Sequence, residues 1–325
     1  MPSPMPYENP APRMPRWAAL TLFAGGIVAL HGTAAAQSAG APVRIGSIAI
    51  DASGESYYGV DSGIFAANGI NAQVTTMNTG AAIITAVLAG DLDVGIANPL
   101  QIAVAIARGV PLQMLAPAAL YSLRDANANL VVAKNSPFKS PKDLIGATFG
   151  VSSLSDFNQL SLLAYLDTNK VPRDSVHFVE LPFSEVGAAL ARGTIGAAII
   201  TEPFKTNAMT AGQIREFGDT YLTIQPEIAP IFWFTTKGWI QKNPDLAKRF
   251  VGAIYATARW ANSHYKESGD ILARVAKMDP AVVASMKRLY FATSNDPKYT
   301  AHTLALAFQY GMLPRAVPFE EFSAF

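Results

Sequence analysis

GDLDVGIANP, residues 90–99, and GTIGAAIITEP, residues 193–203, share one pattern. Each begins with glycine, continues through small and branched apolar residues, and ends on a polar residue followed by proline. Apolar runs of this length between turn residues are typical of strands buried in a sheet. Two such runs, about a hundred residues apart, indicate that the chain contains two similar halves.

The segments around these runs alternate between expected strands and expected helices. Strands are predicted at residues 43–50, 71–78, 93–98, 111–120, 127–135, 147–151, 176–181, 196–201 and 228–240. Helices are predicted between them, at residues 57–69, 81–90, 101–109, 152–169, 183–193 and 203–212. Alternation at this spacing favours an α/β protein whose sheets are mostly parallel and are flanked by helices.

The length of the chain favours two domains. With 325 residues it exceeds the usual size of one domain. We predict a first lobe over residues 37–128, a second lobe over residues 129–232, and a return to the first lobe over residues 233–325. The repeated pattern places one of the two quoted runs in each lobe.

The C-terminal part of the chain is expected to be helical. From Asn243 to about Met312 the sequence shows no predicted strand, so these helices are expected to pack on the first lobe instead of forming a third domain. The chain would then cross between the lobes near residues 127–133 and again near residues 230–236. Two crossings of this kind make a hinge.

The first 36 residues have the pattern of a secretory signal peptide. Arg13 and Arg16 precede an apolar stretch at residues 17–30, and three alanines end the segment. We expect cleavage before Gln37 and a soluble protein in the periplasm. A membrane anchor is the alternative, but about 14 apolar residues fall short of the roughly 20 that span a bilayer.

Charge and cysteine content exclude several kinds of partner. Loss of residues 1–36 removes Arg13, Arg16 and Glu8, which leaves 23 basic and 23 acidic side chains from totals of 25 and 24. A neutral chain lacks the basic footprint on which nucleic-acid recognition depends, so no nucleic acid is expected as a partner. The chain has no cysteine, so it has neither disulfides nor a cysteine at the cleavage site for lipid attachment.

Polar and small residues follow several predicted strands at their carboxyl ends. In open α/β sheets small molecules bind beyond these ends, where helix N-termini present free N–H groups. If the two halves face each other, these loops line one cleft. The candidate ligand-binding residues are Asp51, Ser53, Glu55, Tyr57, Thr79, Gly80, Asn98, Ser152, Ser153, Ser155, Glu202 and Trp233.

Several of these candidates also have a purely structural interpretation. The three serines are ordinary helix caps, and Asn98 before a proline is an ordinary end for a strand. Glu202 follows a buried strand, where a carboxylate is costly unless it is paired, caps a helix or meets a ligand. Trp233 is a core aromatic unless it lies in the second crossing, where it would contact both lobes.

The sequence contains no motif for catalysis or metal binding. It has no GxSxG elbow, no HExxH, no GxxxxGK[ST] loop and no GxGxxG fingerprint. His177, His264 and His302 stand singly, without the spacing of metal ligands. No catalytic residue, metal or cofactor is therefore predicted.

Five segments together carry a resemblance to a known family. They are SYYGVDSGIFAANGI at residues 56–70, TG at 79–80 before a helix, AGDLDVGIANP at 89–99, ARGVPL at 107–112 and ITEPF at 200–204. The chain resembles the solute-binding proteins of ABC transporters, in the NMT1/THI5-like group for taurine, alkanesulfonates, nitrate and thiamine-pyrimidine precursors. The resemblance extends over nearly all of the chain after the signal peptide.

The resemblance implies a monomeric receptor with the two-lobed, type II periplasmic-binding-protein fold, also called a Venus flytrap. Such a receptor captures a small molecule between its lobes, and binding selects a closed form that an ABC permease in the inner membrane recognises. Asn98 and Glu202 would occupy matching strand ends on the two lobes. The ligand would be a sulfonate, a carboxylate or a nitrogen heterocycle.

Two questions stay open at this point. The charge of the ligand is undecided, because the cleft loops contain Glu55 and Glu202 but no lysine or arginine, and Arg124 is the nearest basic candidate. A zwitterion, or a neutral molecule with an aromatic or heterocyclic ring, is the alternative to a sulfonate or carboxylate. A secreted hydrolase or lyase that uses only carboxylates is the alternative to a receptor. Relatives in the group include a pyrimidine synthase that depends on a cysteine-rich motif, and this chain has no cysteine.

Overall fold

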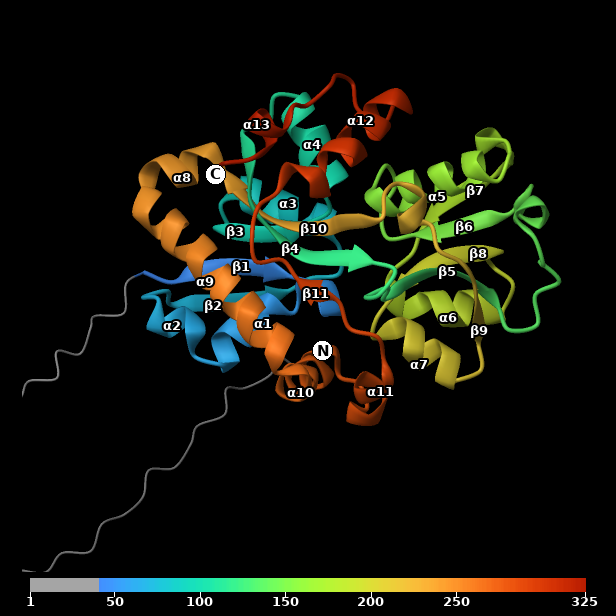
Figure 1. The fold of residues 1–325 in the computed structure, drawn as a ribbon, viewed down its shortest axis with the longest axis horizontal. Coiled ribbons are helices and arrows are strands. Elements are labelled where there is room, and N and C mark those ends of the chain that lie inside the picture. Colours follow the sequence, from blue (N-terminus) through green and yellow to red (C-terminus); the bar gives the residue numbers. More distant parts are fainter. Residues whose placement is uncertain (1–40) are drawn as a thin grey trace, which may run out of the picture. The chain divides into compact units, whose positions relative to one another are not determined.

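The computed structural model describes residues 41–325, which form two sheets and their surrounding helices (Figure 1). The predicted signal peptide, residues 1–36, lies outside the described residues. These described residues belong to one compact unit. The α/β architecture with two sheets is the one that the sequence predicts.

The first sheet has six strands in the order β11-β4-β10-β3-β1-β2. These strands are β1 (Val43–Ser47), β2 (Ala72–Thr76), β3 (Val94–Ala97), β4 (Leu112–Ser122), β10 (Glu227–Thr236) and β11 (Tyr290–Phe291). Strand β1 runs parallel to β2 and β3. Strand β10 runs antiparallel to both β3 and β4, and β11 is antiparallel to β4.

The second sheet has five strands in the order β7-β6-β8-β5-β9. These strands are β5 (Ala128–Ala133), β6 (Thr148–Val151), β7 (His177–Glu180), β8 (Ala197–Thr201) and β9 (Ile214–Gly218). Strand β6 is parallel to β7 and β8, whereas β5 is antiparallel to β8 and β9. Both sheets are therefore mixed, because β5 and β10, the strands that follow the two crossings, run against their neighbours.

The two sequence runs that repeat each other form β3 and β8. Every residue of both strands is buried, which explains why neither run alternates between apolar and polar residues. Each strand lies inside its sheet, with neighbours on both sides. The two halves therefore have matching central strands that end at Asn98 and at Glu202.

Helices cover the faces of both sheets. Before β9 they are α1 (Glu55–Asp61), α2 (Ile64–Ala67), α3 (Gly80–Ala89), α4 (Pro99–Ala107), α5 (Phe157–Thr168), α6 (Phe183–Ala191) and α7 (Phe204–Thr210). The C-terminal helices are α8 (Lys237–Lys242), α9 (Pro244–Ser263), α10 (Tyr265–Ala276), α11 (Pro280–Ser285), α12 (Ala301–Gln309) and α13 (Phe319–Phe322). Short 3₁₀ turns are η1 (Asp51–Ser53), η2 (Pro141–Leu144), η3 (Arg173–Ser175), η4 (Tyr221–Thr223) and η5 (Pro297–Tyr299).

Most of the C-terminal helices pack on the first sheet and its helices, as expected, and α11 also contacts α7 of the second lobe. Helix α9 contacts α1, α2 and β4, and α12 contacts α4. Figure 1 shows α9 alongside β1, α1 and α2. The apolar face of α9 supplies this packing through buried residues such as Phe250 and Ile254.

Four local expectations differ from the structure. Strand β9 and the short β11 were not expected, because each shows little apolar patterning of its own and depends on a neighbouring strand. The segment expected as one strand over residues 228–240 ends at Thr236, whose side chain accepts a hydrogen bond from Trp239 N and begins α8. Glu55 lies in the first turn of α1 and not in a loop.

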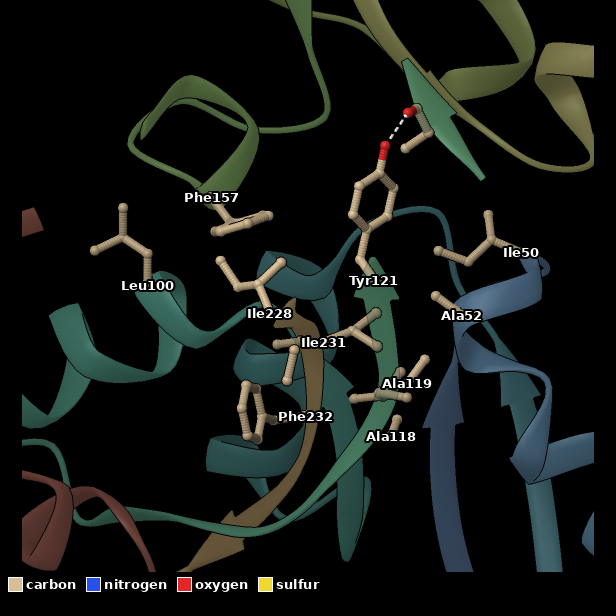
Figure 2. Close-up of a cluster of buried hydrophobic side chains, with 14 of the residues drawn as sticks. Ile50, Ala52, Leu100, Ala118, Ala119, Tyr121, Phe157, Ile228, Ile231 and Phe232 are labelled. Atoms are coloured by element: carbon tan, nitrogen blue, oxygen red, sulfur yellow. Dashed lines mark hydrogen bonds between the residues drawn. The ribbon is translucent and has the colours of Figure 1, made fainter. Parts of the chain in front are cut away.

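The chain passes from the first sheet to the second between Ser122 and Ala128, and it returns between Gly218 and Glu227. The return was expected later, near residues 230–236, but those residues are part of β10 within the first sheet. The hydroxyl of Tyr121 lies 2.7 Å from the Ala128 carbonyl oxygen and 2.7 Å from Asp219 Oδ2 (Figure 2). One side chain therefore connects the two crossings.

Candidate functional site

A cavity of about 60 Å³ lies at the carboxyl ends of strands from both sheets. Its lining residues are Ile48, Ile50, Ala52, Asn78, Thr79, Gly80, Ala97, Asn98, Gln101, Asn127, Ser152, Phe157, Asn158, Phe183, Thr201, Tyr221, Pro230, Ile231 and Leu289. Strand ends and the helix starts after them supply most of these residues, which is the position where α/β sheets bind small molecules.

The first sheet contributes the N-terminal ends of α3 and α4 to the cavity. Thr79 caps α3, since its side chain accepts a hydrogen bond from Ala82 N at 3.2 Å. Asn98 caps α4 in the same way, with its Oδ1 accepting from Gln101 N at 3.0 Å. These caps place the partial positive charge of two helix ends beside the cavity without placing a charged side chain there.

Gly80 occupies a position that has no room for a side chain. A Cβ atom there would lie 2.5 Å from Gln101 Oε1 and 3.1 Å from the Cβ of Ala97. The absence of a side chain at Gly80 lets the amide of Gln101 approach the start of α3. Both residues line the cavity.

The second sheet contributes the start of α5 and a group of hydrogen-bonded polar side chains. Ser152 Oγ donates to Asp156 Oδ2 at 2.5 Å, and Asn158 Nδ2 donates to Ser152 Oγ at 2.9 Å. Tyr221 OH donates to Asn158 Oδ1 at 2.6 Å. Ser152, Asn158 and Tyr221 face the cavity, whereas Asp156 lies beneath them and caps α5 through Gln159 N.

Asp156 is the ionisable group that most directly supports this side of the cavity. Burial raises its pKa to about 6, because the charged form is poorly solvated, although hydrogen bonds from Ser152, Gln159 and Asn158 oppose the shift. Its carboxylate side chain orients two residues of the cavity wall but does not itself line the cavity.

Aromatic and aliphatic side chains form the apolar part of the wall. The rings of Phe157 and Tyr221 lie 4.7 Å apart in an edge-to-face arrangement. Figure 2 shows Phe157 from the second lobe opposite Ile231 and Ile50 from the first. Phe183 adds another ring at the start of α6. The cavity therefore combines uncharged polar groups with an apolar surface, as small-molecule sites commonly do.

The structure brings four of the predicted site residues to the cavity: Thr79, Gly80, Asn98 and Ser152. Of the other predicted residues, none lines it. Ser153 Oγ donates to the carbonyl of Ser152, and Ser155 is exposed, with its N–H donating to Gln159 Oε1. Tyr57 bonds through its hydroxyl to Thr76 Oγ1 at 2.9 Å. Ser53 is buried in η1.

Glu202 lies outside the cavity and caps a helix. Its Oε2 accepts a hydrogen bond from Thr206 N at 2.9 Å, and its Oε1 accepts from Thr206 Oγ1 at 2.9 Å. Lys205 Nζ lies 3.4 Å from Oε1. Burial raises the pKa of Glu202 in spite of these partners. Thr201, one residue earlier, lines the cavity instead.

Trp233 and Glu55 form a buried pair inside the first lobe. Trp233 Nε1 donates to Glu55 Oε2 at 2.7 Å, and both side chains are fully buried. Trp233 was expected to touch both lobes, but the strand that carries it pairs with β3 and β4 well inside the first sheet. Burial raises the pKa of Glu55 well above its ordinary value, and the Trp233 hydrogen bond opposes this only in part.

Asp51 is also buried and lies beside the cavity without lining it. Its carboxylate binds Arg288 Nε at 2.6 Å and Leu289 N at 2.8 Å. The arginine comes from a segment that the sequence did not connect with the first loop.

Sequence reasoning missed several residues of the cavity wall: Asn78, Gln101, Asn127, Phe157, Asn158, Phe183 and Tyr221. A signal for one of them is present, because Asn78 ends the predicted strand before Thr79. Tyr221 and Asn127 lie in the two crossings, where no periodic pattern points to a surface.

Metal chemistry finds no support in residues 41–325, where no group of three or more His, Asp and Glu side chains is placed to hold an ion. None of the helices in the same residues is both long and apolar enough to cross a membrane. The lining of the cavity contains no lysine, arginine, aspartate or glutamate.

Comparison with known proteins identifies the family. The family model described as NMT1/THI5 like matches residues 53–268, which include β2 to β10 and most of the cavity wall. The chain belongs to the NMT1/THI5-like family. This confirms the resemblance inferred from the five sequence segments.

Relatives of this NMT1/THI5-like protein include periplasmic binding proteins. The taurine-binding periplasmic protein of Escherichia coli (strain K12) is 25% identical over 241 residues, which cover 72% of this chain and 67% of that protein. Similar solved structures support the fold. The aliphatic sulphonate binding protein SsuA of Escherichia coli has a TM-score of 0.69 at 18% identity, with 87% of this chain and 92% of that chain covered.

A second structural relative of this NMT1/THI5-like protein is the nitrate-binding protein NrtA of Synechocystis PCC 6803. It has a TM-score of 0.72 at 13% identity, with 84% of this chain and 82% of that chain covered. At such identities the likeness concerns the fold alone. It confirms the periplasmic-binding-protein fold class, with two sheets flanked by helices and with C-terminal helices on the first lobe.

Proposed function

We propose that this protein is the extracytoplasmic ligand-binding component of an ABC importer and that it captures a small organic molecule between its two lobes. The observation that carries the proposal is the cavity, to which strand ends and helix starts of both sheets contribute. A ligand there contacts both lobes, so it stabilises the form in which the lobes are close together. Delivery to an inner-membrane permease, a monomeric state and a periplasmic location belong to the same proposal, which the family supports.

We further propose that the ligand is a small organic anion, a sulfonate or carboxylate with an apolar body. The starts of α3, α4 and α5 meet at the cavity, and their free N–H groups favour a negatively charged group. The lining offers Phe157, Phe183 and Ile231 to an apolar body. A neutral nitrogen heterocycle is the competing ligand class.

A binding screen tests the receptor proposal. Taurine, alkanesulfonates, small carboxylates, nitrate and pyrimidines are added separately to the purified protein, and melting temperature is followed together with calorimetric binding. A true ligand at about a hundredfold over its Kd should add roughly 2.7 kcal/mol to the free energy of unfolding. NMR spectra of each compound before and after incubation check for turnover, and a consumed compound would favour the hydrolase or lyase alternative.

A charge placed at one helix cap tests the class of ligand. Thr79→Asp keeps a good N-cap residue but puts a carboxylate beside the cavity. Binding of an anion should weaken at least about tenfold, since like charges a few ångströms apart repel by more than the 1.4 kcal/mol that tenfold represents. Thr236→Asp at the cap of α8 is the matched control, because Thr236 does not line the cavity. Equal affinity in both variants would favour a neutral ligand.

The location is tested by fractionation of cells that express the full chain. We expect release by osmotic shock and a mature N-terminus at Gln37. Recovery in the membrane fraction with residues 1–36 retained would contradict the export part of the proposal.

A further inference from the structure

Asp51 carries a carboxylate that lies beside the cavity but does not line it. Asp51 has no exposed surface. Its Oδ1 accepts a hydrogen bond from Arg288 Nε at 2.6 Å, and its Oδ2 accepts from Leu289 N at 2.8 Å. Asn127 Nδ2 lies 3.4 Å from the same Oδ2. The carboxylate therefore connects its own segment to two others that are far away in the sequence.

Residues of the cavity wall surround this carboxylate. Ile50 and Ala52 flank Asp51 in the chain and line the cavity. Leu289 and Asn127, which donate to the carboxylate, line it as well. A shift of Asp51 would therefore displace parts of the wall that come from the η1 loop, from the first crossing and from the C-terminal segment.

Asp51 also participates in a contact between the lobes. Its main-chain N–H donates to the carbonyl oxygen of Glu202 at 3.1 Å. Glu202 follows β8 in the second sheet, and its own N–H donates to the carbonyl of Asn127 at 3.1 Å. The position of η1 and the contact between the two lobes are thus linked through one residue.

Arg288 is held so that it can fix this carboxylate. Its side chain is only 10% exposed. Nη2 donates to Tyr58 OH at 2.9 Å and lies 3.3 Å from Ser268 Oγ, while Nη1 donates to the Tyr265 carbonyl at 3.2 Å. Partners on α1 and α10 therefore orient a planar group whose Nε–H donates to Asp51, and lysine has no equivalent fork of donors.

Burial separates this pair from an ordinary surface ion pair. Both charged groups are largely removed from water, so each depends on the other.

We propose that Asp51 and Arg288 are positioning residues of the ligand cavity, which touch no ligand but set the cavity wall and couple it to the contact between the lobes. The role in ligand affinity rests on the proposed function. The role in positioning does not, and it is tested separately.

The first experiment needs no ligand. Amide hydrogen exchange is measured on the whole protein at two N–H groups. The N–H of residue 51 donates to the Glu202 carbonyl across the lobes, and the N–H of Leu289 donates to the Asp51 carboxylate. Arg288→Lys keeps the positive charge, and Asp51→Asn with Arg288→Met removes both charges so that neither is buried alone. We expect exchange at both amides at least tenfold faster in each variant, with the amides of β2 unchanged.

The control is another Arg–Asp pair of the same sheet. Arg44 Nε and Nη2 bind Asp93 at 3.0 and 2.7 Å, and neither residue lines the cavity. Arg44→Lys and Asp93→Asn with Arg44→Met should leave the amides of residue 51 and Leu289 protected. Every protein is measured at the same interval below its own melting temperature. If the Arg288 variants lose melting temperature while those two amides stay protected, the pair is merely structural and the inference is overturned.

The second experiment uses taurine as the probe. If the wild-type protein binds taurine, Arg288→Lys should weaken Kd at least tenfold while Arg44→Lys leaves it within about twofold. Equal Kd values in both variants would overturn the link to affinity. If wild-type protein does not bind taurine, that result concerns the proposed ligand, and the exchange measurement still decides whether the pair positions the wall.

Discussion

Buried carboxylates of this protein have different partners and therefore different roles. Glu202 is nearly inaccessible to water, yet its two oxygens accept hydrogen bonds from Thr206 and lie near Lys205. The side chain thus holds the start of α7, while its main-chain carbonyl accepts from Asp51 across the lobes. Glu202 therefore contributes to the contact between the lobes through its backbone and not through its charge.

Glu202→Ala should lower stability and leave affinity nearly unchanged. The variant removes the cap of α7 but keeps the carbonyl that accepts from Asp51, so we expect a loss of about 0.5–2 kcal/mol in the free energy of unfolding. Lys205 keeps hydrogen bonds to Asn129 and Glu216, which limits the cost of the lost partner. Melting and binding measured on the same variant check this. A clearly weaker Kd with an unchanged melting temperature would place the carboxylate in recognition instead.

Glu55→Gln should stabilise the protein at neutral pH. The pKa of Glu55 is raised in the folded state, so its contribution to stability is fully present below the unfolded pKa near 4.5 and is lost as pH rises through the folded pKa. Glutamine keeps an oxygen that accepts from Trp233 Nε1 but cannot ionise. The melting temperature of the variant should exceed that of wild type at pH 7–8, with the difference shrinking toward pH 4. Glu227→Gln, at an exposed residue, is the control.

Helix starts decide the character of the cavity at the scale of the elements. Helices α3, α4 and α5 begin after strand ends, and their caps are Thr79, Asn98 and Asp156. The caps belong to both lobes, so the polar ends of the helices meet where the sheets meet. An uncharged lining next to several helix dipoles follows from this arrangement.

Gly80→Ala should destabilise the protein and disturb Gln101. Alanine is a better helix former than glycine, but the added Cβ would lie 2.5 Å from Gln101 Oε1 and 3.1 Å from Ala97 Cβ. We expect a loss of about 1–3 kcal/mol, the usual cost of overpacking. Gly252→Ala in α9 is the matched control, because nothing lies within 4 Å of its added Cβ, and it should gain about 0.5–1 kcal/mol. Denaturant unfolding of both variants measures the difference, and a gain at residue 80 as well would contradict the predicted crowding.

More of the fold than of the candidate site could be predicted from the sequence. Buried strands such as β3 and β8 were predictable because their apolar runs end at turn residues. The helices between them were predictable because the same kinds of turn residues mark where they begin and end. Strand β9 and β11 were not, because their pairing depends on neighbours that are distant in the chain. In the site, Thr79, Gly80, Asn98 and Ser152 follow strand ends and were predictable. Tyr221 and Asn127 depend on how the crossings fold, which no local pattern encodes.

At the scale of the whole molecule, surface contacts among Tyr310, Asp167 and Arg173 join the two lobes, and we call this group the clasp. Tyr310 follows α12, which packs on α4 of the first lobe, and its hydroxyl donates to Asp167 Oδ2 on α5 of the second at 2.6 Å. Arg173 lies over the Tyr310 ring at 4.2 Å and binds Asp167 at 3.2 Å. These contacts favour the form in which the lobes are close together.

Tyr310→Phe should weaken ligand binding without touching the cavity. Loss of one hydrogen bond is worth about 0.5–1.5 kcal/mol, so we expect a Kd roughly two- to tenfold weaker, because the ligand must then supply more of the closure. The radius of gyration from small-angle scattering should rise in the unliganded variant and return toward the wild-type value with ligand. Tyr290→Phe on β11 is the control. An unchanged radius of gyration and an unchanged Kd would contradict a role of the clasp in closing the lobes.

The order of strands has a consequence for how the protein is made. Every strand of the second sheet comes from residues 128–218, whereas β10, from residues 227–236, lies between β3 and β4 of the first sheet. A nascent chain can complete the second sheet while β3 and β4 still lack the strand that joins them. Because pairing between distant segments slows folding, the first sheet is expected to assemble last, after the C-terminal third has been synthesised. Ligand capture would therefore begin only once the chain is complete. An incomplete chain would have a folded second sheet but no assembled first sheet against which it could close.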